Sequence, residues 1–221
     1  GLASGCYILA LRLAWPPLNG LDRFLTVVVP AALAIELAAG FQRVRPWLAW
    51  VLRIFLAAAI PRILLHDSVY LSSTDGPWAS WQAGAVLVIA SGLLVFLWSL
   101  LSWLSRRSPG SSIPIALSMA ILCAGATIMM AGYVKGGATA FPLAITLVAA
   151  TVSVRLTASR SAPAEHLDTA VLLGIGVVGL FGLLFIGRFF GEISSGCALA
   201  ILLSPLLCWV TELPLLRNRK P

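Results

Sequence analysis

The chain has 221 residues, of which 60% are hydrophobic and only 10% are charged, and its mean hydropathy is +0.98. Soluble domains carry about 25% charged residues, so this composition excludes a water-soluble fold and makes the lipid bilayer the solvent for most of the chain. The net charge of +7 does not indicate nucleic-acid binding, because the only dense Lys/Arg run is RNRK at 217–220.

Apolar segments separated by short polar turns run through the whole sequence. A transmembrane helix needs about 20 apolar residues, and continuously apolar segments indicate helices rather than membrane β-strands, in which apolar and polar residues alternate. We therefore predict an all-α, polytopic bundle with short loops that forms a single integral membrane domain over residues 1–221. The eight predicted spans, the first of them incomplete, cover residues 1–15, 24–40, 47–65, 81–104, 113–134, 138–156, 169–190 and 197–216.

The positively charged residues are distributed unevenly over the two sets of span ends. Because Lys and Arg are retained on the cytoplasmic side, the richer set predicts the cytoplasmic face of a plasma membrane, with both termini on that side. Two arginines, Arg12 and Arg53, lie within spans instead. The richer set is Arg43, Arg45, Arg106, Arg107, Arg155, Arg160, Arg217, Arg219 and Lys220, and the poorer set is Arg23, Arg62, Lys135 and Arg188.

Three ionisable residues are predicted to lie inside the bilayer near its cytoplasmic face: Glu36, Arg53 and Glu212. A central Arg, Lys or Asp costs about 2.5–3.5 kcal/mol on insertion scales, so we expect these groups to be paired. Spans 24–40 and 47–65 are joined by a short turn and should pack antiparallel, which favours Glu36 over Glu212 as the partner of Arg53. We interpret this pair as structural, with snorkelling or a substrate or proton path as the alternatives.

A second polar group is predicted at the outer face. Arg62 and His66 are four residues apart on one helix face, and Arg188 and Glu192 are four apart in the stretch FIGRFFGE. If these side chains converge, their positive charges form a site for an anionic or lipid-like ligand, with Glu192 orienting Arg188. The alternative is that each side chain reaches the lipid headgroups separately.

No motif identifies a catalytic, metal or cofactor site. The chain has two histidines and no HExxH, GxSxG or phosphate-binding glycine motif. The four cysteines all lie in apolar runs, which predicts small buried hydrophobic side chains. We therefore expect no cofactor and no metal ion. The remaining catalytic hypothesis, less favoured than a non-enzyme, is a lipid-modifying enzyme with His66 or Asp67 as the general base.

Glycine is frequent in span 169–190, where Gly187 and Gly191 form a GxxxG spacing, as do Gly132 and Gly136. Small residues let helices approach closely in lipid, so we expect these faces to pack helices within the chain, with a homo-oligomer or other membrane subunits as alternative partners. The best functional hypothesis is binding or transport of a small anionic or lipid-like ligand at the outer polar group. A structural or accessory subunit of a membrane complex is the main alternative.

Overall fold

The structure is a computed structural model, and it describes residues 17, 19–40, 46–66, 68, 80–107, 112–158 and 169–207. These residues are helical apart from short turns, and none of them lies in a strand. Six of the helical segments are long and apolar enough to cross a membrane. The predicted all-helical class is therefore confirmed, with six described helices long and apolar enough to cross a membrane, whereas the predicted count of eight spans is not.

The first described span runs from Gly20 to Gly40 and contains one widened turn. It consists of α2 (Gly20–Arg23), the π-helical segment η1 (Phe24–Val28) and α3 (Val29–Gly40). The N–H of Val29 bonds the carbonyl of Phe24, five residues back, directly before Pro30. Because proline has no N–H, the series of backbone hydrogen bonds between residues four apart is interrupted here. The wider π-helical turn accommodates this interruption.

The remaining helices begin and end within a few residues of the predicted spans. The predicted span 1–15 lies outside the described residues, and the predicted span 197–216 is described only to residue 207, as a short apolar helix. The helices are α4 (Pro46–Leu64), α5 (Ser80–Arg107), α6 (Ser112–Met130), α7 (Val134–Ala138), α8 (Ala140–Ala158), α9 (Thr169–Phe190) and α10 (Ser195–Leu203).

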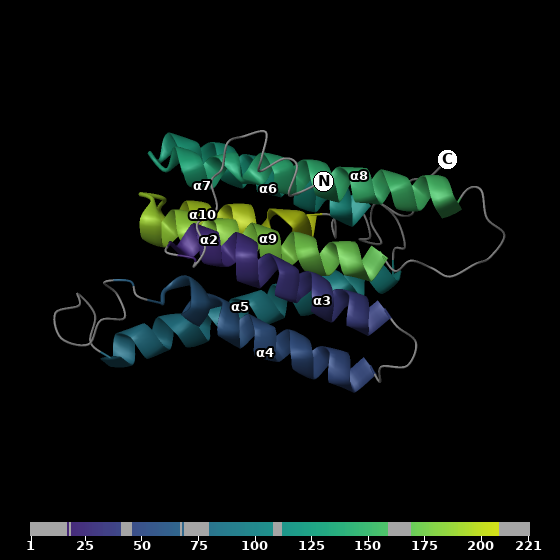
Figure 1. Cartoon of the computed structure of the whole chain (residues 1–221), viewed down its shortest axis with the longest axis horizontal. Helices are drawn as coiled ribbons and strands as arrows, with labels where there is room; N and C mark the ends of the chain where they lie inside the picture. Colours follow the sequence, from purple (N-terminus) through teal and green to yellow (C-terminus); the bar gives the residue numbers. More distant parts are fainter. Residues whose placement is uncertain are drawn as a thin grey trace.

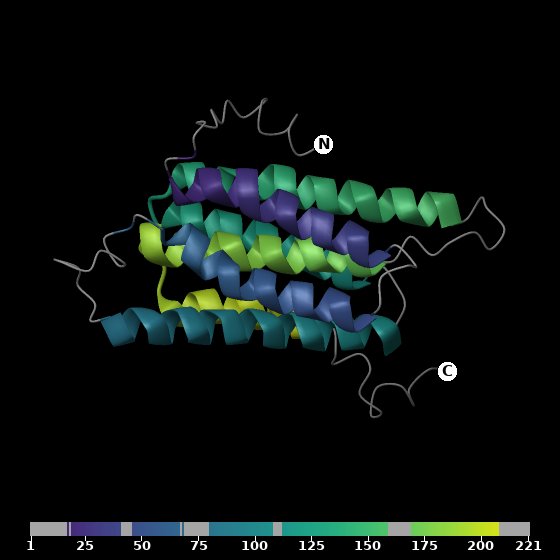
Figure 2. The same cartoon turned by 60° about the horizontal axis from the view of Figure 1, so that its bottom comes forward.

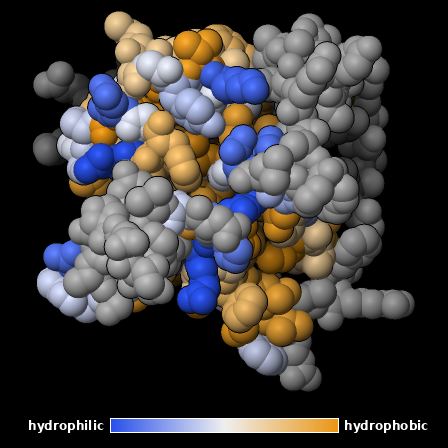
Figure 3. Space-filling view, turned by 60° about the vertical axis from the view of Figure 1, so that its left-hand side comes forward, coloured by the Kyte–Doolittle hydropathy of each residue, from blue (hydrophilic) through white to orange (hydrophobic). Residues whose placement is uncertain are grey.

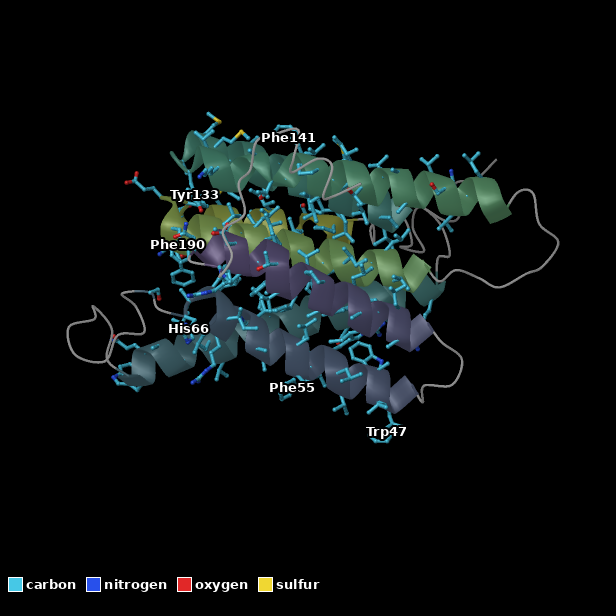
Figure 4. All side chains as sticks on the ribbon, viewed as in Figure 1. Trp47, Phe55, His66, Tyr133, Phe141 and Phe190 are labelled. Carbon is cyan, nitrogen blue, oxygen red and sulfur yellow. The ribbon has the colours of Figure 1, made fainter. Side chains whose placement is uncertain are left out.

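Helix α9 lies at the centre of the bundle. In Figure 1 it runs, with α2, α3 and α10, between α6, α7 and α8 above and α4 and α5 below. The turned view in Figure 2 again places α9 among the other helices. In the most apolar stretch of α9, 78% of the residues are buried, against 22% in α5. We call the end of the bundle where α9 finishes the Phe190 end, and the opposite end the Trp47 end; both residues are labelled in Figure 4.

The glycines of α9 let neighbouring helices approach it closely. A Cβ atom at Gly179 would lie 2.6 Å from Leu143 of α8, and one at Gly176 would lie 3.0 Å from Leu117 of α6. The ring of Phe24 packs directly on Gly182. The glycine-rich face therefore packs helices inside this chain, as expected from the sequence.

The outer surface of the bundle is largely apolar. Phe55 is 74% exposed and lies on the outer side of α4 (Figure 4), and Met130 is 90% exposed. Side chains of this kind belong in contact with lipid rather than water. Cys123 and Cys197 are also exposed, so the prediction that they are buried is wrong: they lie on outward faces of α6 and α10. The other two cysteines are outside the described residues.

Candidate functional site

Glu36 of α3 and Arg53 of α4 form a bidentate salt bridge. The Nε–H of Arg53 donates to Oε1 of Glu36, and the Nη2 group donates to Oε2, both at 2.7 Å. The side chain of Glu36 is 1% exposed and that of Arg53 is 10% exposed. Arg53 is seven residues into α4, about 10 Å along the helix from its first residue. The two parallel charge-assisted hydrogen bonds offset the desolvation cost of burying both charges.

Three further residues complete the surroundings of this pair. The Cζ atom of Arg53 lies 5.4 Å from the ring centroid of Trp50 and 5.7 Å from that of Trp98, distances typical of cation–π contacts. A Cβ atom at Gly174 of α9 would lie 2.5 Å from Cδ of Glu36. We call these five residues the Arg53 centre. Sequence reasoning missed the two tryptophans and Gly174, and Glu212 lies outside the described residues.

The ends of α2, α4 and α9 meet at the Phe190 end. A Cβ atom at Gly20 would lie 3.1 Å from the carbonyl oxygen of Leu64 and 3.1 Å from the ring of Phe190. Arg23 donates from Nη1 to the carbonyl oxygen of His66, just beyond the end of α4. An arginine that bonds a terminal carbonyl stabilises a helix C-terminus. Figure 4 shows His66, Phe190 and Tyr133 at this end of the bundle, each beside a different layer of helices.

The side chain of Arg62 lies on the outward face of α4. It follows Phe55 by seven residues and Ala58 by four, and all three are exposed. This face is therefore directed away from the core. His66 is exposed as well. Figure 3, which looks at the Phe190 end, shows hydrophilic side chains in several separate places between apolar ones.

Arg188 is joined to α10 instead. Its Nε–H donates to Oγ of Ser195 at 2.9 Å, and the arginine is exposed. Because α9 ends at Phe190, Glu192 lies beyond the helix and the two charged residues are not a helical i,i+4 pair. Within the described part of the chain, no ion pair joins Arg188 to Glu192. Sequence reasoning missed Ser195, which lies in a stretch, ISSG, that reads as a polar turn.

The first turn of α10 has backbone donors next to Arg188. Ser194 is the N-cap and its Oγ accepts from the N–H of Cys197 at 3.3 Å, while the N–H of Ala198 bonds the carbonyl of Ser194. Among the residues described, the N–H groups of Ser195 and Gly196 have no hydrogen bond. A Cβ atom at Gly196 would meet nothing within 4 Å. We call Arg188, Ser195 and Gly196 the Arg188 site.

Tyr133 lies between α6 and α7, outside the membrane-spanning segments, and is half-buried. Burial raises the pKa of its phenol, and the nearby carboxylate of Asp22 raises that pKa further. Asp22 is buried in α2. Gly132, directly before Tyr133, has a φ of +87°, which a residue with a side chain rarely adopts, so glycine makes this turn possible.

No group of three or more His, Cys, Asp or Glu residues that could hold a metal ion is found within the ranges given above. Asp67, one of the two candidate general bases, lies outside them. No family model, no curated protein and no solved structure matches the chain. Inferences about function therefore depend on the geometry of the Arg53 centre and the Arg188 site.

Proposed function

We propose that this chain is a multi-pass membrane protein that binds the anionic group of a small or lipid-like ligand at the Arg188 site. The observation that carries the proposal is the hydrogen bond from Arg188 to Ser195, because it holds the guanidinium beside the first turn of α10. Only Nε is used, and the Nη1 and Nη2 groups have no hydrogen bond to the rest of the described chain. A guanidinium offers phosphate or carboxylate oxygens two parallel donors.

The start of α10 supports an anion at the same place. The first N–H groups of a helix lack intrahelical partners and carry partial positive charge. In α10 the N–H of Cys197 donates to Oγ of Ser194, so the N–H groups of Ser195 and Gly196 are the ones available to a ligand. Ser195 and Gly196 are both exposed, and a Cβ atom at Gly196 would meet nothing within 4 Å. Phosphate and carboxylate groups are the common ligands of such helix termini.

Two other residues of the predicted outer polar group, Arg62 and Glu192, do not contact the ligand in this proposal. Arg62 is on the outward face of α4, where its charge suits the headgroups of surrounding lipid. Glu192 is exposed close to Arg188 in sequence, and its negative charge opposes an anionic ligand. The close packing of α9 on α6 and α8 supports binding rather than transport along that helix.

The test is lipid-dependent stabilisation of the purified chain in dodecyl maltoside micelles. We expect added phosphatidylglycerol to raise the melting temperature, because a ligand that binds only the folded state stabilises it by mass action. Arg188→Gln should weaken the apparent affinity about tenfold or more, the effect of losing a hydrogen bond to a charged group. Arg62→Gln is the matched control, since it removes the same charge from a different surface and should change the affinity little.

Further arms of the same experiment define the ligand. Inorganic phosphate in place of the lipid shows whether the anion alone is bound, and Glu192→Gln should tighten binding by removing a competing charge. Equal losses of affinity for Arg188→Gln and Arg62→Gln would mean that surface charge alone attracts the lipid. That result, or no stabilisation by either probe, would overturn the proposal.

A further inference from the structure

The indole N–H of Trp98 is a buried donor without an acceptor among the described residues. Trp98 lies in α5, is 1% exposed, and its Nε1 has no hydrogen-bond partner in the described part of the chain. Nearly all buried polar groups in proteins are hydrogen-bonded to protein, water or ligand, and an unpaired donor in an apolar interior is costly. The position therefore calls for an acceptor that is not a described protein atom.

A second set of donors lies beside this indole. The Trp98 ring is one of the two rings in contact with the guanidinium of Arg53. Arg53 uses Nε and Nη2 to bond Glu36, and its Nη1 group has no hydrogen bond within the described ranges. The Arg53 centre thus has more N–H donors than acceptors.

The charge balance of the centre restricts what can supply the missing acceptor. Within the described part of the chain, the charge of Arg53 is opposed by that of Glu36, and the helices around them carry their other ionisable side chains only near their ends. An added anion would therefore leave a net charge in the interior of the bundle, which is strongly unfavourable. A neutral oxygen acceptor has no such cost. The other ionisable residues on α3, α4, α5 and α9 are Arg62, Arg106, Arg107 and Arg188.

We infer that the Arg53 centre is a binding site for a neutral oxygen acceptor, which receives the hydrogen bond of the Trp98 indole. The oxygen belongs to an ordered water molecule or to the carbonyl group of a membrane amphiphile, since both present the same chemistry to the N–H group. This site is at the opposite half of the bundle from the Arg188 site and does not depend on the proposed function.

The test removes the N–H group without changing the volume of the side chain. Trp98 is replaced by 3-benzothienylalanine, in which sulfur stands in place of the indole N–H, and the exposed Trp81 receives the same replacement as the control. Unfolding by sodium dodecyl sulfate is followed by circular dichroism in dodecyl maltoside micelles with and without phosphatidylcholine. A hydrogen bond of ordinary strength predicts that the folded-to-unfolded ratio falls about fivefold at position 98 and not at position 81.

The two arms identify the source of the oxygen. An equal loss with and without lipid indicates water, and a loss confined to micelles containing lipid indicates the amphiphile. An unchanged or increased ratio in both arms means that the N–H has no partner and overturns the inference. If the substituted chain does not fold, the indole N–H resonance of Trp98 is measured in the ¹⁵N-labelled wild-type chain instead. A downfield, slowly exchanging signal supports a bound acceptor. An upfield signal excludes one.

Discussion

Gly174 of α9 lies against the carboxylate of Glu36, so that a Cβ atom at position 174 would be 2.5 Å from Cδ and 2.6 Å from Oε1 of that residue. The end of a glutamate side chain can ordinarily move aside. Here both carboxylate oxygens are bonded to Arg53, so a displacement would disturb the ion pair. Position 174 of α9 therefore has to be glycine for the salt bridge between Glu36 and Arg53 to form as observed.

The substitution Gly174→Ala is expected to lower the free energy of unfolding by about 1–3 kcal/mol, the range for overpacking a closely packed interior. Gly92→Ala in α5 is the matched control, because a Cβ atom there would meet nothing within 4 Å. In an exposed helix position this change should be neutral or stabilise by up to about 1 kcal/mol. Both are measured by detergent-induced unfolding, and equal effects at the two positions would contradict the close contact.

Removing either charge of the Arg53 centre should be more harmful than removing both. Glu36→Leu or Arg53→Leu leaves the other group buried without its partner, and each is expected to cost about 3–5 kcal/mol. The double substitution leaves no buried charge, so its cost should be well below the sum of the single costs. Unfolding of the four proteins in a double-mutant cycle measures this coupling, and additive losses would show that the two residues do not interact.

The phenol of Tyr133 should make stability decrease at high pH. Its pKa is raised above the ordinary value of 10.0 in the folded chain, so the folded state holds the proton more tightly than the unfolded state. This contribution to stability is present below pH 10 and is lost as the pH rises through the higher folded-state pKa. Tyr133→Phe should remove this part of the pH dependence.

Asp22 provides an independent check of the same titration. Burial is the larger cause of the raised pKa and the charge of Asp22 is the smaller one, so Asp22→Asn should lower the pKa of Tyr133 without restoring the ordinary value. The phenolate absorbance of the wild type minus that of Tyr133→Phe isolates this tyrosine from the other two in the chain. No change in the difference titration on Asp22→Asn would exclude the interaction.

The predicted orientation can be tested at the two ends of the bundle. Lys135 is exposed near the Phe190 end, and Arg155 is exposed near the end of α8, at the Trp47 end. In a cysteine-free chain, the positive-inside rule predicts that Lys135→Cys reacts with a membrane-impermeant maleimide added outside cells. Arg155→Cys should react only after the membrane is permeabilised. The reverse labelling pattern would contradict the orientation.

Much of the fold could be predicted because the relevant information is local. Each of the six described spans is an apolar stretch of helix-forming length, and hydropathy finds such stretches without reference to the rest of the chain. The juxtaposition of Glu36 and Arg53 is also nearly local. Only five residues, 41–45, separate their helices in the sequence, so the helices are expected to pack antiparallel and to place the two residues at a similar level of the bundle.

The partner of Arg188 was not predictable in this way. The spacing to Glu192 suggested a helical pair, but α9 ends at Phe190 and the chain turns into α10, which presents Ser195 to the arginine. Arg62, although expected at the same face of the membrane, lies on the outward side of α4. The sequence thus placed both arginines near the ends of their helices, as the structure does, but it did not give the direction of either side chain.

The sequence by itself determined that this chain forms apolar helices long enough to cross a bilayer, because the composition and length of each apolar segment can be read without reference to the rest of the chain. The tertiary structure alone decided that Gly174 faces Glu36, that Trp98 lies over Arg53 and that Arg188 bonds Ser195. The physical reason is that helices apolar on every side carry no pattern that specifies their rotation, so the contacts between them follow from the close packing of all the helices together.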